Sequence, residues 1–333
     1  MDEDGGHAPR PDQVGHDQDA ARGPIPPPSG TRCSTEPPSI AGNRRAGLAV
    51  IVGLAAVMIS LATAITISSK PSTAAITSAL PGSVTTVSGS NPAAVKQIIS
   101  PQEISAETLA GLPQATTFAT IPGAPQDPTP FARTAGRIVH PTATVALYAV
   151  PGGPAIAALP AQQKFGELTT DTKVPVISEN PGWAQVLLPS RPNGSTAWIY
   201  LDNPAVSTER SKFRVVVDRA RFTLSLVERE TPIGTWTVGI GRPGAITPPG
   251  RTFILSSILD NGPKSFSPVI LPLGSHSDTF SSYGGGPGTV GIHTWPTAAV
   301  FGRASSDGCV RVPPGALDVI SRTVPLGSVV EIT

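Results

Sequence analysis

Hydrophobic positions are unevenly distributed along the chain, and the longest apolar run lies near its amino end. Residues 46–67 contain no charged side chain. As a helix rising about 1.5 Å per residue, this run would be about 33 Å long, enough to cross a bilayer. Arg44 and Arg45 precede the run, whereas a single Lys70 follows it. The positive-inside rule therefore predicts a single-pass signal anchor in the cell membrane, with a cytoplasmic amino terminus and an extracytoplasmic remainder.

Two other interpretations of this apolar run agree less well with its surroundings. A buried core helix would need a soluble domain around it, but both flanks are polar or proline-rich. A cleaved signal peptide usually has an apolar region of about 7–15 residues. The run here is longer than that, and it follows a long leader of mixed charge. Both features favour a membrane anchor that is retained.

The segments on either side of the run lack the apolar residues that a folded core requires. Residues 1–45 are rich in Asp, Gly and Pro with few aliphatic residues, and predict a disordered cytoplasmic tail. Residues 68–131 are rich in Ser, Thr, Ala and Pro, and predict an extended stalk. A short helix within residues 91–112 is expected to interrupt that stalk.

Short segments that alternate apolar and polar residues fill 132–207, with Pro-Gly and Asn-Gly turns between them. This pattern predicts a small antiparallel β-barrel. The Gly-Trp pair at Trp183, the turn at 191–194 and the strand carrying Trp198 and Tyr200 resemble a bacterial SH3-like domain. We expect both tryptophans in the barrel core or at a module interface, with a ligand groove as the alternative.

A second β-rich pattern occupies residues 211–333. Three consecutive strands are predicted in FRVVV, RARFTLSLVE and TPIGTWTVGIG, followed by a rigid turn at 247–250 and another strand. The glycine-rich residues 281–288 predict a mobile flap. A short helix is expected between Pro314 and Pro325, and VPLGSVVEIT is expected to form the last strand. The predicted fold class is thus mainly β, with one short helix in this domain.

Charge and cysteine content narrow the possible functions. The net charge is +1 and only 14% of the 333 residues are charged, which excludes the basic surface typical of nucleic-acid binding. The two cysteines, Cys33 and Cys309, lie on opposite sides of the predicted membrane span. Cys309 is therefore predicted to be a free thiol. His293 precedes it by sixteen positions, and a nearby histidine can activate a cysteine nucleophile.

Four segments, TPPGRTFIL, GIHTW, SSDGCVRV and VPLGSVVEIT, occur in an order that resembles the L,D-transpeptidase catalytic domain. The resemblance covers roughly residues 212–333. It implies a β-sandwich or barrel of the L,D-transpeptidase type, preceded here by the SH3-like barrel and the membrane helix. The combination of the histidine with Ser-Asp-Gly-Cys-Val-Arg carries the resemblance, because a Gly-Cys pair alone is common.

The chemistry of the motif suggests a role for each of its residues. Cys309 is the expected nucleophile and His293 the general base and acid. An oxygen of Thr294 or Ser306 is expected to orient the second ring nitrogen of the histidine. Gly308 allows a backbone conformation in which its own amide and that of Cys309 face a developing oxyanion.

Further residues are candidates for substrate binding. Arg311 either binds a substrate carboxylate or braces the cysteine turn, and Tyr283 lies where the family's capping loop often has an aromatic residue. Trp295 replaces a residue that is usually small and is expected to reshape the acyl pocket. Asp307 stands where many members have histidine, and is expected to point outward or pair with Arg303 or Arg311. His276 is expected to be an exposed loop histidine.

The resemblance implies a reaction on peptidoglycan stem peptides at the cell wall. Cys309 would attack the third residue of a tetrapeptide stem and release D-alanine, and an amine of a second stem would resolve the thioester into a 3→3 cross-link. No cofactor and no metal is expected. The alternatives are an L,D-carboxypeptidase or other cysteine peptidase acting on stems, and a non-catalytic wall-binding protein. The sequence makes no prediction of oligomeric state.

Overall fold

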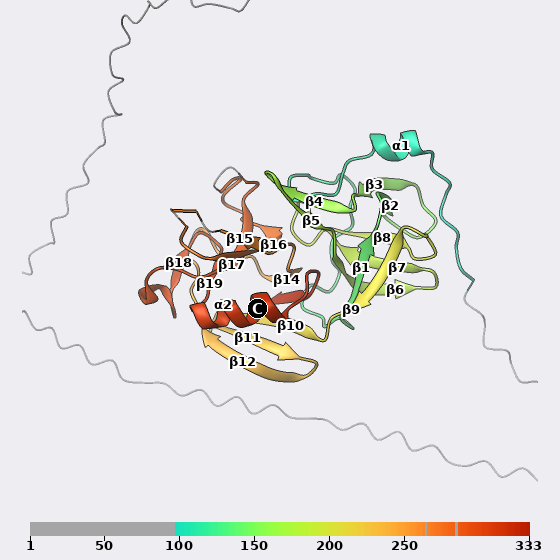
Figure 1. Ribbon diagram of the computed structural model, residues 1–333. Helices are drawn as coiled ribbons and strands as arrows, with labels where there is room; N and C mark the ends of the chain where they lie inside the picture. The colour runs from blue at the N-terminus through green and yellow to red at the C-terminus, as the bar shows by residue number, and fades with distance from the viewer. Residues whose placement is uncertain (1–96, 261, 264, 284–285) are drawn as a thin grey trace, which may run out of the picture. The chain divides into compact units, whose positions relative to one another are not determined.

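The computed structural model describes residues 97–333, apart from 261, 264, 284 and 285 (Figure 1). The predicted tail, the apolar run 46–67 and the first part of the predicted stalk lie outside these residues. Within the described part of the chain, no helix is long and apolar enough to span a membrane. Below, residues 97–211 are called the first module and residues 212–333 the second module.

The first module is mainly β, in agreement with its alternating pattern. One sheet has the strand order β3-β2-β8-β7-β6-β1-β9, and β4 and β5 pair as a separate hairpin. Its elements are α1 (Ala106–Gly111), β1 (Arg137–Pro141), β2 (Val145–Tyr148), β3 (Ala155–Leu159), β4 (Gln162–Phe165), β5 (Leu168–Asp171), β6 (Val174–Asn180), β7 (Trp183–Leu187), β8 (Thr196–Tyr200) and β9 (Val206–Arg210). That this module is of the SH3 type stays a prediction.

Trp183 lies in the interior of the first module, as expected for a core residue. Its side chain is 1% exposed, and its ring packs edge-on against Tyr148 and at a tilt against Tyr200. Its indole N–H donates to the Ile99 carbonyl oxygen at 2.7 Å, which satisfies the one polar group of the buried ring. Trp198, on β8, is only partly buried.

The prediction of an extended stalk through residue 131 is wrong for residues 97–131. The Ala115 amide donates to the Ala158 carbonyl at 2.7 Å, and the Ile121 amide to the Arg191 carbonyl at 3.2 Å. Ala115 and Ile121 are themselves buried. A proline-rich segment cannot build its own core, but its backbone bonds here to the edge strand β3 and to the loop between β7 and β8. The expected short helix is present as α1, which Ser105 caps by accepting from the Thr108 amide.

The second module contains the strands and the helix that its pattern predicts. A five-stranded sheet has the order β12-β11-β10-β20-β14, a four-stranded sheet the order β15-β16-β17-β19, and β13 pairs with β18. The bounds are β10 (Phe213–Asp218), β11 (Thr223–Glu228), β12 (Thr231–Thr237), β13 (Ile240–Gly241), β14 (Gly250–Phe253), β15 (Ile258–Leu259), β16 (Val269–His276), β17 (Thr289–His293), a 3-10 turn (Ala298–Val300), β18 (Ala304–Ser306), β19 (Val310–Arg311), α2 (Pro314–Thr323) and β20 (Val329–Ile332).

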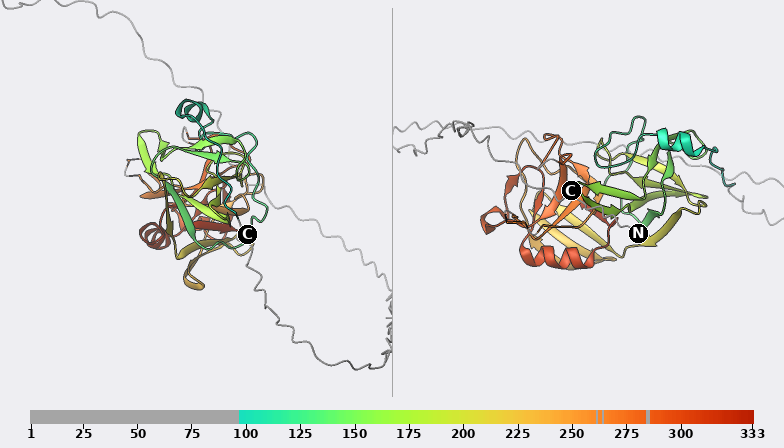
Figure 2. Two further views of the ribbon diagram at one scale, coloured as in Figure 1. Left: turned by 90° about the vertical axis from the view of Figure 1, so that its right-hand side faces the viewer. Right: turned by 45° about the horizontal axis from the view of Figure 1, so that its top comes forward.

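Alternation of side chains places the core of the second module between its sheets and α2. On β10, Val215 and Val217 point inward and are fully buried, whereas their neighbours are partly exposed. Pro314 opens α2, where a missing amide hydrogen costs nothing. The helix lies beside β10 and β11 (Figures 1 and 2) and buries Ala316, Leu317 and Ile320. These residues share one hydrophobic cluster with strands of both sheets.

The two modules also share buried surface. Phe253 ends β14 of the second module, and Leu255 lies two residues after it. Both side chains nevertheless belong to the hydrophobic cluster of the first module. Both side chains are fully buried. The first module therefore completes part of the packing of the second.

Candidate active site

Parallel pairing of β17 with β19 brings the predicted histidine and cysteine together. Ile292 pairs with Val310, and His293 with Arg311. Extending this register by one residue places Cys309 opposite Gly291, two positions before His293 on the same face of β17. Both side chains line one cavity of about 630 Å³. Residues sixteen positions apart in sequence thus become neighbours across a strand pair.

The ring of His293 is held in one orientation and one tautomer. Nδ1 lies 2.6 Å from the Thr294 carbonyl oxygen, and a carbonyl only accepts, so Nδ1 carries the hydrogen and Nε2 keeps its lone pair. Phe266 packs edge-on against the ring, with centroids 4.8 Å apart. Burial lowers the pKa of His293 to about 4. The histidine is therefore a neutral base at physiological pH.

The surroundings of Cys309 also favour its neutral thiol form. Burial raises the pKa of Cys309 and Asp307 raises it further, whereas the Gly291 backbone and the charge of Arg311 lower it. The side chain keeps partial exposure toward the cavity. A neutral thiol beside a neutral histidine suits proton transfer at the moment of attack, rather than a preformed ion pair.

The turn before Cys309 is built from Ser306 and Gly308. The Ser306 hydroxyl donates to the Cys309 carbonyl at 2.5 Å and accepts from the Gly308 amide at 3.2 Å. Ser306 therefore braces the turn, and among the two candidates it is Thr294 that contacts the histidine. Gly308 has a φ of 121°, which favours glycine. Because its amide is engaged by Ser306, the expected oxyanion contact would require that hydrogen bond to break, a point on which the prediction and the structure differ.

Asp307 points outward, as expected, but its partner differs from both predicted arginines. Its carboxylate accepts from Arg242 at 2.9 Å, and both side chains are about half exposed. Arg242 comes from the loop after β13, which the sequence does not connect with the cysteine turn. The Tyr283 hydroxyl donates to the Asp307 carbonyl oxygen. Tyr283 also lines the cavity, so the predicted capping residue lies next to the cysteine.

Arg311 and Trp295 stack on each other beside the site. The guanidinium carbon of Arg311 lies 3.9 Å from the centroid of the Trp295 ring, close enough for a cation–π interaction. The same guanidinium donates to the Ser305 carbonyl at 3.3 Å. Of its two predicted roles, the structure supports bracing, since neither Arg311 nor Trp295 is among the residues that line the cavity. A substrate role for either residue stays a prediction.

His276 is a buried residue and not the exposed loop histidine that was expected. It ends β16 and is fully buried. Its Nε2 lies 2.7 Å from the Thr117 carbonyl oxygen and 3.1 Å from the Thr117 hydroxyl. Burial lowers its pKa to about 4. The prediction fails because Thr117 belongs to a segment that the sequence assigns to a stalk.

The first module supplies part of the cavity wall, which no sequence signal indicates. Phe118 comes from the loop after α1, and Phe165 and Gly166 come from the β4–β5 hairpin. In Figure 1 this hairpin lies beside β15 and β16. Phe266, from the loop before β16, is a further missed lining residue.

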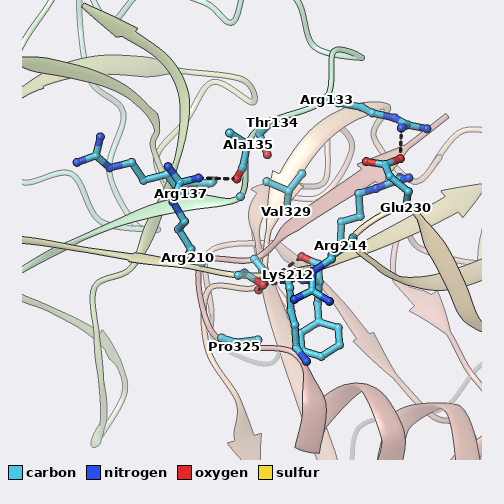
Figure 3. Close-up of a pocket in the computed structure, with 17 residues that line it drawn as sticks. Arg133, Thr134, Ala135, Arg137, Arg210, Lys212, Arg214, Glu230, Pro325 and Val329 are labelled. Atoms are coloured by element: carbon cyan, nitrogen blue, oxygen red, sulfur yellow. Dashed lines mark hydrogen bonds and ion pairs between the residues drawn. The ribbon is translucent and has the colours of Figure 1, made fainter. Parts of the chain in front are cut away.

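A second cavity of about 580 Å³ lies between the modules and is rich in arginine (Figure 3). Most of its charges are already paired. Arg133 contacts Glu230, as the dashed line shows, and Arg214 contacts Glu331 at 2.9 Å. Lys212 contacts Glu228 at 2.7 Å. This cavity has no cysteine or histidine in its lining. Of its three ion pairs named here, Arg133–Glu230 joins the two modules, and the other two lie within the second module. Among the described residues, no group of His, Cys, Asp and Glu side chains is suited to hold a metal.

The second module matches a known catalytic domain. Residues 212–332 match the family model described as YkuD, L,D-transpeptidase catalytic domain. The match covers a little over a third of the chain and coincides with the second module. It supports the resemblance carried by the four sequence segments. A search of curated proteins found no match.

Several solved L,D-transpeptidases are similar in structure. One from Stackebrandtia nassauensis is 22% identical, with 38% of this chain and 57% of that chain covered and a TM-score of 0.29. One from Mycobacterium smegmatis is 13% identical, with 48% and 99% covered and a TM-score of 0.30. One from Mycobacterium tuberculosis H37Rv is 16% identical, with 42% and 73% covered and a TM-score of 0.31. The chain thus spans little more than half of the length of the first of these.

Proposed function

We propose that the chain is a membrane-anchored peptidoglycan L,D-transpeptidase that forms 3→3 cross-links through a thioester on Cys309. The observation that carries the proposal is the pairing of β17 with β19, which brings His293 and Cys309 into one cavity. The match of the second module to the L,D-transpeptidase catalytic domain supports the reaction class.

In the first step, Cys309 Sγ forms a bond with the carbonyl carbon of the third residue of a donor stem. The thiol proton passes to the free Nε2 of His293, whose position is set by the bond from Nδ1 to Thr294. The bond from that carbonyl carbon to the nitrogen of the terminal D-alanine then breaks, and His293 returns the proton to the leaving amine. A thioester remains on the protein.

In the second step, the side-chain amine of a diamino acid on another stem attacks the thioester carbonyl. His293 takes a proton from this amine, the carbon–sulfur bond breaks, and the thiolate regains the proton. One amide bond is broken and another is formed, so the reaction needs no nucleotide, cofactor or metal. The Cys309 cavity is large enough, at about 630 Å³, for a peptide segment to enter.

The membrane anchor and the location outside the cell are part of this proposal. They are supported by the uncharged run 46–67 and by Arg44 and Arg45 before it. An anchor of this kind would keep the cysteine near newly made wall. The first module would then work beside the catalytic site and not only as a distant wall-binding domain.

A direct test is to incubate the full-length chain, purified in mild detergent, with tetrapeptide stems that contain a diamino acid, and to read the products by mass. A dimer lighter than two stems by one D-alanine, absent with Cys309→Ala, is the expected result. Tripeptide without dimer would replace the transpeptidase by a carboxypeptidase. If neither product forms and a carbapenem adds no mass to Cys309, the proposal is wrong.

A further inference from the structure

The mouth of the Cys309 cavity carries exposed aromatic side chains. Phe118 is 57% exposed and Phe266 is 38% exposed, and both line the cavity with Phe165. Leu168, at the tip of the same hairpin as Phe165, is 51% exposed. Large apolar side chains gathered at the rim of a cavity mark a surface that a ligand covers. Two of these aromatic rings, Phe118 and Phe165, belong to the first module.

A buried polar cluster fixes Phe118 in place. The hydroxyl of Thr117, the preceding residue, lies 3.1 Å from His276 Nε2 on β16 and 2.9 Å from the Thr289 hydroxyl on β17. Thr117 and His276 are at most 1% exposed. Because β17 ends at His293, this cluster ties Phe118 to the strand that carries the catalytic base.

The hairpin that carries Phe165 is fixed to the same segment. Gln163 on β4 is fully buried, and its side-chain amide donates to the Ala115 carbonyl at 3.2 Å. It also donates to the Thr172 hydroxyl at 3.2 Å. Buried hydrogen bonds of neighbouring residues thus hold the backbone that carries both aromatic residues. Phe165 also packs against the hydrophobic cluster of the first module, whereas Phe118 is exposed. Such preorganisation is expected of a binding wall.

The first module also holds the loop that carries Tyr283. The Arg191 guanidinium donates to the Ser277 carbonyl at 3.3 Å and to the Pro287 carbonyl at 3.0 Å. These two acceptors lie at either end of the loop. Contacts from the first module therefore help to hold the loop of the second module that lines this side of the cavity.

The charges of the cavity indicate which part of a substrate this wall binds. Asp260 is the one charged lining residue among those described, apart from the titratable His293 and Cys309, and the lining includes no lysine or arginine. The scissile bond of a donor stem lies one residue from a terminal carboxylate, and among the described residues this wall offers that carboxylate no cation. The amine of the acceptor is a cation before it reacts, with an ordinary pKa of about 10.4. Aromatic faces and a carboxylate attract such a group.

We propose that Phe118, Phe165 and Asp260 form the binding site for the acyl acceptor, and that it receives the side-chain ammonium of a diamino acid on the second stem. The inference rests on the transpeptidase function proposed above. The ammonium first loses one proton to water, and the free amine nitrogen then forms the new amide bond with the thioester carbonyl carbon. His293 takes the second proton from that nitrogen and passes it to the Cys309 thiolate as the carbon–sulfur bond breaks. The first module thereby contributes two of the three side chains that bind the acceptor, and the second module contributes Asp260.

The kinetic test varies the acceptor at a fixed concentration of donor stem, with the full-length chain. In Phe118→Ala, the KM for the acceptor amine is expected to rise about three- to tenfold, because a cation–π contact is lost. The rate of D-alanine release without acceptor reports the donor step alone, and it is expected to change by a smaller factor than the acceptor KM. Phe118→Leu should behave like Phe118→Ala and Phe118→Trp like the native chain, because the ring face and not apolarity is required.

Leu168→Ala is the matched control, since this exposed side chain lies on the same hairpin but does not line the cavity. Its acceptor KM should equal that of the native chain. Equal losses of donor and acceptor steps in Phe118→Ala would overturn the assignment. So would an unchanged acceptor KM in both Phe118→Ala and Phe165→Ala.

A second test separates this inference from the transpeptidase proposal, because it needs no stem peptide. In a full-length Cys33→Ser background, Cys309 is modified with methanethiosulfonates carrying a trimethylammonium group, a sulfonate group, or a methyl group alone. The thiolate displaces methanesulfinate and forms a mixed disulfide in each case. Phe118→Ala is expected to lower the ratio of cationic to anionic rates about three- to tenfold, while the neutral reagent reacts as before. An unchanged ratio would overturn the cation site, even if cross-linking is observed.

Discussion

At the scale of single residues, burial determines the charge state of the reactive pair. It raises the pKa of Cys309 and lowers the pKa of His293 to about 4. Both changes favour the neutral forms, because a low-dielectric environment penalises charge. The resting pair is therefore a thiol and an imidazole, and in the mechanism proposed above the proton moves only when a carbonyl carbon is attacked. This differs from cysteine sites that hold a thiolate and an imidazolium in the resting state.

The pH dependence of activity follows from this charge state. The base must be unprotonated, and its lowered pKa keeps it so down to about pH 4. The acid limb of D-alanine release should therefore lie near pH 4, well below the ordinary histidine value of about 6.5. Initial rates between pH 3.5 and 8, with circular dichroism at each pH to confirm folding, provide the measurement. An acid limb near 6.5 in the folded protein would contradict the neutral pair.

Removing the charge of Asp307 should make Cys309 more reactive. The carboxylate raises the pKa of the thiol, so Asp307→Asn should shift the pH at which iodoacetamide alkylates Cys309 to a lower value. Alkylation rates against pH, read by intact mass in a Cys33→Ser background, measure this shift. Asp318→Asn is the control, because this exposed carboxylate lies on α2 and pairs with Arg322. A shift of the same size in the control would assign the effect to net charge alone.

The residue scale also shows where prediction from sequence succeeds. The sequence predicts that His293, Thr294 and Cys309 lie close together, because they are near one another in the chain and lie on or beside two strands that pair, β17 and β19. The partner of Asp307 is missed because Arg242 lies on a separate loop, brought near only by the pairing of β13 with β18. His276 is misjudged for the same reason, since the contact that buries it is with Thr117.

At the scale of elements, the segment 97–131 is held by a buried ion pair. Arg251 on β14 donates from Nε to Asp127 at 2.6 Å and from a terminal nitrogen at 2.7 Å, and both side chains are at most 2% exposed. Asp127→Asn leaves a buried guanidinium uncompensated and should lower the free energy of unfolding by about 3–5 kcal/mol. Urea unfolding of the native and variant chains measures this change.

The matched control for this ion pair is Asp318→Asn on α2. The Arg322–Asp318 pair is 2.7 Å long but its side chains are 78% and 55% exposed, so its loss should cost roughly 0–1 kcal/mol. Similar losses in Asp127→Asn and Asp318→Asn would show that residues 97–131 do not stabilise the fold.

Elements with their own periodicity are predicted well, and docked segments are not. The hairpins β10–β12, the helix α2 and the strand β20 are predicted from alternation, from Pro314 and from a final apolar run. Residues 97–131 have no such pattern, because their backbone bonds to strands elsewhere in the chain. Composition correctly indicates that this segment has no core of its own, but it does not indicate whether another core receives it.

At the scale of the whole molecule, the buried histidine between the modules links stability to pH. His276 has a pKa of about 4 in the fold, lowered first by burial and then by Arg191, against about 6.5 when unfolded. The unfolded chain therefore gains the proton first, and stability falls as pH decreases from 6.5 to about 4, by roughly 3 kcal/mol. His276→Gln should reduce the slope of the free energy of unfolding against pH in this range.

Urea unfolding at several pH values compares this slope with that of the native chain. His140→Gln is the control, because this ring lies near the surface beside Asp171. His293 contributes a similar slope of its own, so the variant should lose only part of the dependence. An unchanged slope in His276→Gln would mean that the ring is already protonated or exposed in the folded protein.

The shared packing of the two modules indicates which part of the chain folds as one unit. The family match begins at residue 212, yet Phe253 and Leu255 beyond that boundary are fully buried in the cluster of the first module. A fragment of residues 212–333 would expose both side chains, at about 1.5–3 kcal/mol each, and would lose the Asp127 partner of the buried Arg251. These losses are comparable with the whole stability of a domain.

The fragment 212–333 is therefore expected to unfold without a cooperative transition or to aggregate, whereas residues 97–333 should unfold in one transition. Thermal unfolding followed by circular dichroism distinguishes the two. Adding Phe253→Ser and Leu255→Ser to the fragment should improve its solubility if exposure of these side chains is the cause. A stable fragment with an alkylation profile of Cys309 like that of the full chain would show instead that the catalytic module folds alone, and that the first module acts only on the substrate.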